Sequence, residues 1–231
     1  MADMGAFRTA VTAWAAGGPG GPARELAARL SVRTAVLLEG ASDRAAVDAL
    51  AARHGRDPAA EGICVLPMGG AMNVGRFARV LGPSGLGLRL TGLCDERERG
   101  FYVRALTPAA PAPHSRTASA GLVGSGTAPS GLAGGGTALT GLFVCAADLE
   151  DELIRALGVA RVTELVEAEG DLRPLRTFLR QPAQRDRPAG QQVRRFLGTK
   201  KGRKIHYGRV LVEALEPGRV PAPLAGLLAA L

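Results

Sequence analysis

The chain has 231 residues and a formal net charge of +8, with 29 lysines and arginines against 21 aspartates and glutamates. Its apolar runs are shorter than the roughly 18 residues of a membrane-crossing helix, and its start lacks the charged-then-apolar pattern of a secretion signal. We therefore expect a cytoplasmic protein. The positive charge favours an anionic partner, and nucleic acid is the most common partner of that kind.

Two residue types refine this first reading. Arginines are scattered along an Ala/Gly/Arg-rich chain, which a coding bias would also produce, whereas the three lysines lie together between residues 200 and 204. The cysteines Cys64, Cys94 and Cys145 are odd in number and lack the paired spacing of a zinc site. We expect them to be buried free thiols.

Residues 1–30 predict an N-terminal helical arm that carries no catalytic pattern. Two amphipathic stretches, residues 7–15 and 23–30, flank a break rich in glycine and proline. Trp14 is the expected anchor of this arm on the edge of the sheet.

An uncharged apolar run at residues 35–38 ends abruptly at Glu39. Such a run predicts a buried parallel strand, and ligands of open α/β sheets bind at the carboxyl ends of their strands. Ser42 is the expected N-cap of the following helix, and Asp43 lies in its first turn, where a negative charge is stabilised by the helix dipole. Glu39 is thus expected to face a substrate or a metal.

Two more strands are predicted before the middle of the chain. Residues 62–67 form a second strand, followed by a glycine turn and a helix over 74–81. Residues 88–95 form a third strand that ends on Asp95, and Glu98 follows one turn later. The third strand therefore resembles the first, because its apolar run also ends in a carboxylate at the carboxyl edge of the sheet.

Residues 107–141 are dominated by Gly, Ala, Pro, Ser and Thr and show neither helical nor strand periodicity. We expect this low-complexity insertion to be disordered, because it has too few large apolar residues to pack. A short fourth strand follows at residues 142–145, and Asp148 and Glu150 stand at the start of the next helix.

The pattern is wholly helical from residue 159 onward, which predicts a C-terminal α-helical cap over residues 159–231 next to an α/β domain at residues 31–158. The cap is rich in basic residues, although an ordinary solvated protein surface can be equally rich in them. We favour contact with the phosphate backbone of DNA. The residues expected to make it are Arg194, Arg195, Lys200, Lys201 and Arg203.

If consecutive right-handed crossovers make the strands parallel, the acids at their ends meet at one edge of the sheet. Each acid alone could be explained by a helix dipole, but their coincidence predicts a shared site for Mg²⁺ or Mn²⁺, with two ions expected. Lys204 would neutralise charge on the reacting phosphate, and Glu39 and Lys204 are the candidate catalytic residues. The candidate metal ligands are Glu39, Asp43, Asp95, Glu98, Asp148 and Glu150.

The segments 36–43, 92–98 and 143–154 resemble the acidic motifs of the TOPRIM (topoisomerase/primase) domain. The Asp-Leu-Glu run at residues 148–150 is the most specific part. More narrowly, the segments resemble the C-terminal domain of overcoming-lysogenization-defect (OLD) ATP-dependent endonucleases. The resemblance implies a four-stranded parallel sheet flanked by helices and metal-dependent cleavage of DNA. By position, the family's acidic residues correspond to Glu39, Asp43, Asp95, Asp148 and Glu150, and its late basic residue to Lys204.

The chain departs from this family in two ways. Arg97 occupies the place of the second acid in the second motif, so Glu96 or Glu98 must replace that acid, and we favour Glu98. The phosphate-binding Gly-x-x-x-x-Gly-Lys-Ser/Thr loop of the family's ATPase region is absent from this sequence. Any dependence on ATP would therefore require a separate ATPase subunit.

Three functions compete on this evidence. The leading hypothesis is a metal-dependent DNA nuclease that hydrolyses a phosphodiester with water. The alternative is a non-catalytic DNA-binding or ATPase-partner subunit, which Arg97 favours. A phosphoacceptor domain of receiver type also gathers acids at strand ends, but it needs a lysine directly after the last strand, and Lys204 lies in the helical cap.

Overall fold

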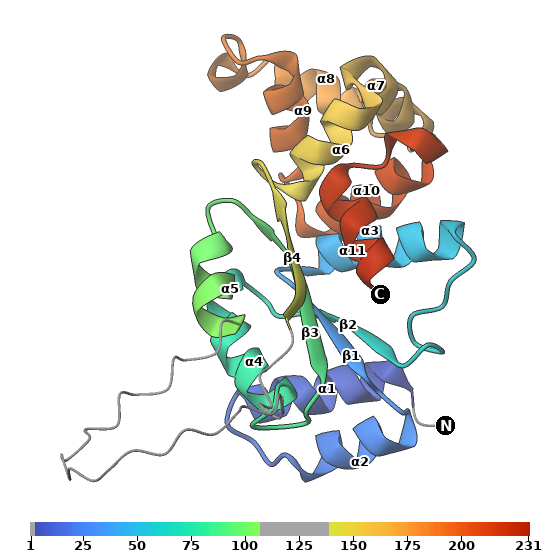
Figure 1. Ribbon diagram of the computed structural model, residues 1–231. Helices are drawn as coiled ribbons and strands as arrows, with labels where there is room; N and C mark the ends of the chain where they lie inside the picture. Colours follow the sequence, from blue (N-terminus) through green and yellow to red (C-terminus); the bar gives the residue numbers. More distant parts are fainter. Residues whose placement is uncertain (1–2, 107–138) are drawn as a thin grey trace, which may run out of the picture.

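The protein is described by a computed structural model that covers residues 3–106 and 139–231 (Figure 1). Its centre is a parallel sheet with the strand order β2-β1-β3-β4, which confirms the predicted four-stranded parallel α/β architecture. The four strands are β1 (Thr34–Leu38), β2 (Ile63–Pro67), β3 (Arg89–Asp95) and β4 (Leu139–Cys145).

Helices cover both faces of the sheet, because alternate strand residues point to opposite sides. Ala35 and Leu37 of β1 are buried against one face, and Val36 and Leu38 against the other. The first face is covered by α1 (Met4–Ala15), α2 (Gly21–Arg29), α4 (Val74–Leu81) and α5 (Arg99–Leu106), with the 3-10 turn η1 (Ala71–Asn73). The second is covered by α3 (Ala41–Arg53) and α11 (Ala222–Ala230), and α10 (Lys201–Glu213) packs on α3.

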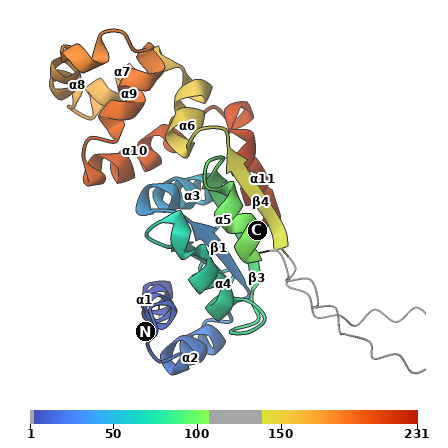
Figure 2. The same ribbon diagram turned by 90° about the vertical axis from the view of Figure 1, so that its left-hand side faces the viewer.

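The remaining helices gather beyond the carboxyl ends of the strands, at the end of the molecule opposite α1 and α2 (Figure 2). They are α6 (Leu149–Leu157), α7 (Val159–Ala168), α8 (Leu172–Leu179) and α9 (Ala189–Leu197), with the 3-10 turns η2 (Pro182–Gln184) and, before α11, η3 (Pro217–Arg219). The predicted C-terminal cap is therefore divided. Helices α7–α9 pack on one another and on α6, whereas α10 packs along α3 and α11 packs against β4.

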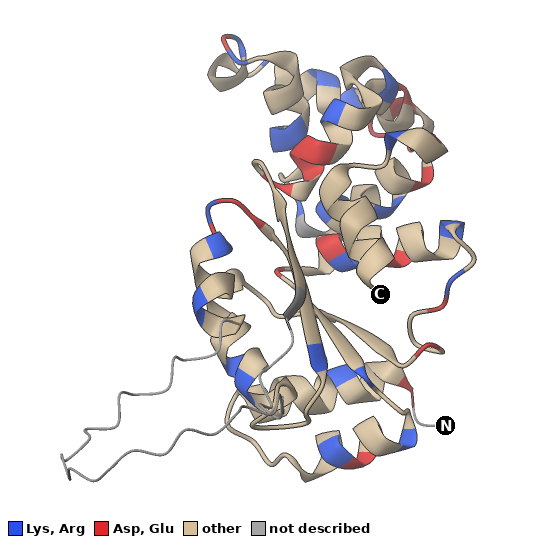
Figure 3. Ribbon diagram, viewed as in Figure 1, with Lys and Arg blue, Asp and Glu red and all other residues tan. Residues whose placement is uncertain are grey.

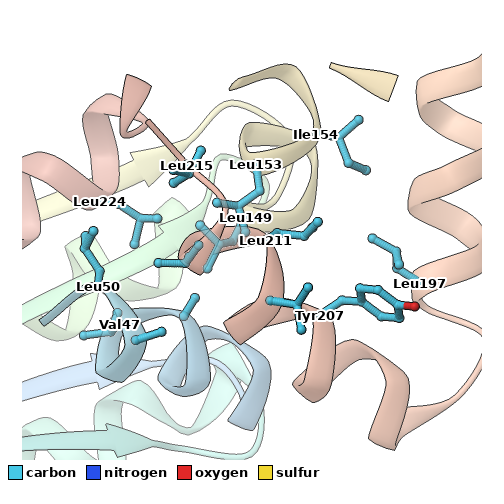
Figure 4. Close-up of a cluster of buried hydrophobic side chains, with 14 of the residues drawn as sticks. Val47, Leu50, Leu149, Leu153, Ile154, Leu197, Tyr207, Leu211, Leu215 and Leu224 are labelled. Carbon is cyan, nitrogen blue, oxygen red and sulfur yellow. The ribbon is translucent and has the colours of Figure 1, made fainter. Parts of the chain in front are cut away.

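One cluster of buried apolar side chains packs the cap helices against α3, which covers the sheet (Figure 4). Val47 and Leu50 of α3 pack with Leu153 of α6 and with Leu211 of α10, and all four side chains are buried. Burial of a leucine or valine side chain contributes about 1.5–3 kcal/mol. The position of α10, and hence of Lys204, is thus fixed by the core.

Two predictions about boundaries were wrong. Helix α3 begins at Ala41 with Gly40 in the N-cap position, so Ser42 is inside the first turn and is not the cap. The insertion predicted at residues 107–141 includes three residues that form the start of β4, because the low-complexity composition continues into the strand. Residues 107–138, on which the prediction of disorder falls, lie outside the described part of the chain.

The three cysteines are free and buried, as predicted. Within residues 3–106 and 139–231, every helix is too short or too polar to cross a membrane.

Candidate functional site

The candidate site lies where the strand order reverses. From β1 the chain crosses to β2 on one side, and β3 then lies on the other side of β1. Ligands of open α/β sheets bind at such a switch point. The register pairs Leu38 with Leu93, so Glu39, just after β1, lies beside the end of β3, where Asp95 stands.

Three carboxylates meet at this point and form what we call the acidic triad. Glu39, Asp95 and Glu98 each offer one carboxylate oxygen, and these oxygens lie within 4.8 Å of one another. Glu98 reaches the triad because a turn follows β3, in which its backbone N–H donates to the Asp95 carbonyl at 3.0 Å.

The structure brings Glu98, rather than Glu96, to the other two acids. Glu96 is exposed and lies 3.6 Å from Arg99 in an ion pair. Arg97, which holds the place of the family's second acid, is exposed and lines a neighbouring pocket. The missing acid of the second motif is thus replaced by a carboxylate one residue further along the chain.

The triad carries more negative charge than its surroundings compensate. Burial raises the pKa of Asp95 to about 7, with further increases from the charges of Asp148 and Asp43. Burial and a contact with Glu39 raise the pKa of Glu98 to about 7. The Oε2 atom of Glu98 is buried and has no hydrogen-bond partner among the described residues.

Such a cluster fits a hard divalent cation. Carboxylate oxygens are the ligands that Mg²⁺ and Mn²⁺ prefer, and a cation would supply the partner that Glu98 Oε2 lacks. It would also favour the ionised state of acids that burial and like charge now disfavour.

Asp43 lies beside the triad, but its carboxylate is already hydrogen-bonded to the backbone at the start of α3. Its Oδ2 accepts a hydrogen bond from the Gly40 backbone N–H at 2.8 Å. Burial raises the pKa of Asp43 to about 6, although this hydrogen bond and the charge of Lys204 oppose the increase. Asp43 therefore holds the loop that carries Glu39.

The acids of the third motif, Asp148 and Glu150, form ion pairs with basic side chains. Asp148 is the N-cap of α6, accepting from the Asp151 N–H at 2.8 Å, and it forms an ion pair with Arg194 at 2.6 Å. Glu150 is 4% exposed, and its Oε2 lies 3.3 Å from Lys204 Nζ. Burial raises the pKa of Glu150 to about 7.

Lys204 is held as a cation. Burial opposes its charge, but the carboxylates of Glu150 and Asp43 outweigh burial and raise the pKa of the ammonium group. The structure thus brings the predicted Lys204 to the acids from a helix more than 50 residues further along the chain.

A pocket of about 530 Å³ opens next to Asp148 and Glu150, and we call it the cationic pocket. Five basic side chains against these two acids give it a positive balance, which suits a phosphate group. Figure 3 shows basic segments of the upper helices next to the acids after β4. The basic residues that line it are Arg97, Arg187, Arg194, Arg195 and Lys204.

Sequence reasoning predicted only part of this pocket. Arg194 and Arg195 were expected to contact nucleic acid, and both line it. Arg187 was missed because Pro188 separates it from the basic run, and Gln191 because it is uncharged and looks like an ordinary surface residue. Their position on the turn before α9 and on its first turn is the only sequence signal that could have found them.

The other predicted nucleic-acid contacts lie elsewhere. Lys200 is exposed on the far side of the turn between α9 and α10, and the side chain of Lys201 is outside the described part. Arg203 binds Asp171 through Nε at 3.0 Å and Nη2 at 3.1 Å, and its side chain is 9% exposed. The ion pair with Asp171 thus engages the Arg203 guanidinium, although Arg203 also lines a second pocket with Lys200, and its contact with nucleic acid stays a prediction.

The part of the chain that carries the first two acidic motifs matches a known family. Residues 32–96, which carry Glu39, Asp43 and Asp95, match the family model described as overcoming lysogenization defect protein-like, TOPRIM domain. Over these residues the chain is similar to the TOPRIM domain of OLD-like proteins. The search among curated proteins found no match.

Solved structures show the same fold. The C-terminal region of the Xanthomonas campestris pv. campestris OLD protein superposes with a TM-score of 0.56 and 21% identity, over 86% of this chain and 93% of that chain. The C-terminal region of the Burkholderia pseudomallei OLD protein gives a TM-score of 0.54 and 17% identity, over 86% and 96%. At these identities the likeness establishes the fold alone.

Proposed function

We propose that this protein is a metal-dependent nuclease that hydrolyses a phosphodiester of DNA. The observation that carries the proposal is the acidic triad, in which three carboxylates meet at the switch point and leave Glu98 Oε2 buried without a partner. Carboxylates this close raise one another's pKa, and a bound cation would reverse that increase.

Glu39, Asp95 and Glu98 are the residues that would hold a Mg²⁺ or Mn²⁺ ion. Such an ion, when bound, lowers the pKa of a bound water and neutralises charge on the phosphate. A second ion would have to displace Arg194 from Asp148 and Lys204 from Glu150, so the triad is the primary site.

The side chains around the triad supply binding and charge. The cationic pocket holds phosphates of the strand beside the acids. Lys204 donates hydrogen bonds to phosphate oxygens, where negative charge grows during the reaction. Glu39, which directly follows β1, would accept a proton from water.

A non-catalytic module is the second candidate. Arg97 favours it, since a cation stands where the family has an acid, beside the phosphate pocket. In that case the protein binds DNA for a separate ATPase subunit and its acids hold a cation without hydrolysis.

Incubation with supercoiled plasmid tests the proposal. The wild-type protein with Mg²⁺ or Mn²⁺ should nick or linearise the plasmid, and EDTA or Glu39→Gln should abolish cleavage. Glu96→Gln is the matched control, because this exposed acid lies outside the triad and should leave cleavage unchanged. Plasmid that stays supercoiled with wild-type protein, although metal binding is measured, would favour the non-catalytic module.

A further inference from the structure

A second pocket lies on the other side of α9 from the cationic pocket, between α8 and the turn that leads to α10, and we call it the aromatic groove. Its volume is about 450 Å³. Figure 1 shows α8 and α9 side by side at this end of the molecule. The residues that matter here are Arg173, Phe178, Gln181, Phe196, Thr199 and Lys200.

Phe178 presents a rigid, partly exposed ring to this groove. Its centroid lies 5.8 Å from that of Phe196, at an interplanar angle of 57°. Phe196 is itself buried, and the guanidinium of Arg203 lies over its ring at 4.1 Å. Because Asp171 fixes Arg203, the Phe196 ring that packs against Phe178 is held in place.

Two exposed cations flank the ring. Arg173 on α8 and Lys200 before α10 line the groove, and neither side chain has a hydrogen bond or an ion pair within the described residues. Gln181 and Thr199 add polar groups between them. An aromatic ring with free cations beside it is the arrangement on which the bases of single-stranded nucleic acids stack.

The cationic pocket and the aromatic groove border the same turn after α9. Gly198 lines the cationic pocket, and the next two residues, Thr199 and Lys200, line the aromatic groove. Consecutive Cα atoms are about 3.8 Å apart. A strand with one phosphate in the cationic pocket would cross this turn to reach Phe178.

We propose that the aromatic groove binds an unpaired DNA nucleotide, whose base stacks on Phe178 while Arg173 and Lys200 hold its phosphates. Paired bases keep their faces inside the duplex, so only an unpaired base can reach the ring. The inference rests on the proposed function and specifies its substrate class, DNA with a single-stranded segment.

Fluorescence anisotropy in EDTA, which prevents cleavage, tests this inference. The probes are a labelled single strand of about 12 nucleotides, within the usual site size, and a duplex of equal length. Phe178→Leu keeps an apolar side chain in place and should weaken single-strand binding by about 5- to 100-fold, with duplex binding unchanged. Phe178→Trp should retain binding, and Arg173→Ala with Lys200→Ala should weaken it and flatten its salt dependence.

Arg176→Ala is the matched control, because this exposed arginine lies on α8 outside the groove. Equal single-strand affinity of Phe178→Leu, Arg176→Ala and the wild type would overturn the inference. So would equal affinity of the wild-type protein for both probes. If Phe178→Leu weakens binding but neither the plasmid nor the single strand is cleaved in Mn²⁺, the nuclease proposal fails and the nucleotide site stands.

Discussion

Gly208 of α10 lies directly against the backbone of Ser42 in α3. A Cβ atom at Gly208 would lie 2.6 Å from the Ser42 carbonyl oxygen, closer than real Cβ atoms approach a backbone. The absent side chain thus lets α10 pack on the first turn of α3. Lys204, one turn earlier on α10, is thereby brought to Glu150 and to the charge of Asp43.

Gly208→Ala should therefore separate the two helices. We expect the free energy of unfolding to fall by about 1–3 kcal/mol, the usual cost of overpacking, and plasmid cleavage to fall with it. Gly202→Ala is the control in the same helix, since a Cβ there meets nothing within 4 Å. It should raise the free energy of unfolding by about 0.5–1 kcal/mol in the same urea titration. Equal stability of the two variants would contradict the close packing.

Glu98→Gln should weaken the binding of Mn²⁺ by at least about 10-fold in calorimetry, because it removes one charged ligand of the triad. Glu96→Gln should bind as the wild type does, since Glu96 is paired with Arg99 at the surface. If the two substitutions have the same effect, the replacement of the missing acid by Glu98 is wrong.

The stability of the metal-free protein should fall as the pH rises from about 4 to about 7. Burial raises the folded-state pKa of Asp95, Glu98 and Glu150 to about 7, above the ordinary values of 3.8 for Asp and 4.5 for Glu. In this interval the folded state binds more protons than the unfolded state, so the free energy of unfolding decreases with pH. Divalent cations bind the ionised carboxylates, so Mg²⁺ should raise the melting temperature more at pH 8 than at pH 6. Thermal unfolding at the two pH values, with Mg²⁺ or EDTA, measures both effects, and a metal effect that is larger at pH 6 would contradict them.

Lys204→Ala should destabilise the fold as well as impair cleavage. It leaves Glu150 buried without its cation, which should cost about 1–2 kcal/mol, below the range for fully buried pairs because Lys204 is partly exposed. The double variant Lys204→Ala with Glu150→Gln should regain most of the stability but none of the cleavage. Recovery of cleavage in the double variant would show that Lys204 serves only to neutralise Glu150.

Sequence and structure agree where a local pattern determines the outcome. Glu39 and Asp95 were placed correctly because each ends an apolar run, and parallel strands bring such ends together. The choice between Glu96 and Glu98 depended on the turn before α5, which the sequence left open. The approach of Gly208 to Ser42 and the ion pair of Arg203 with Asp171 join residues far apart in the chain. Neither has a local signature, so neither could be predicted.

The most direct test of the account is a crystal structure grown with Mn²⁺, examined by anomalous scattering. The account predicts a Mn²⁺ peak among the carboxylates of Glu39, Asp95 and Glu98, with the ion pair between Lys204 and Glu150 still present. A Mn²⁺ ion at Asp148 and Glu150 alone, or a folded protein with no peak at the triad, would contradict the claim that the triad is the metal centre.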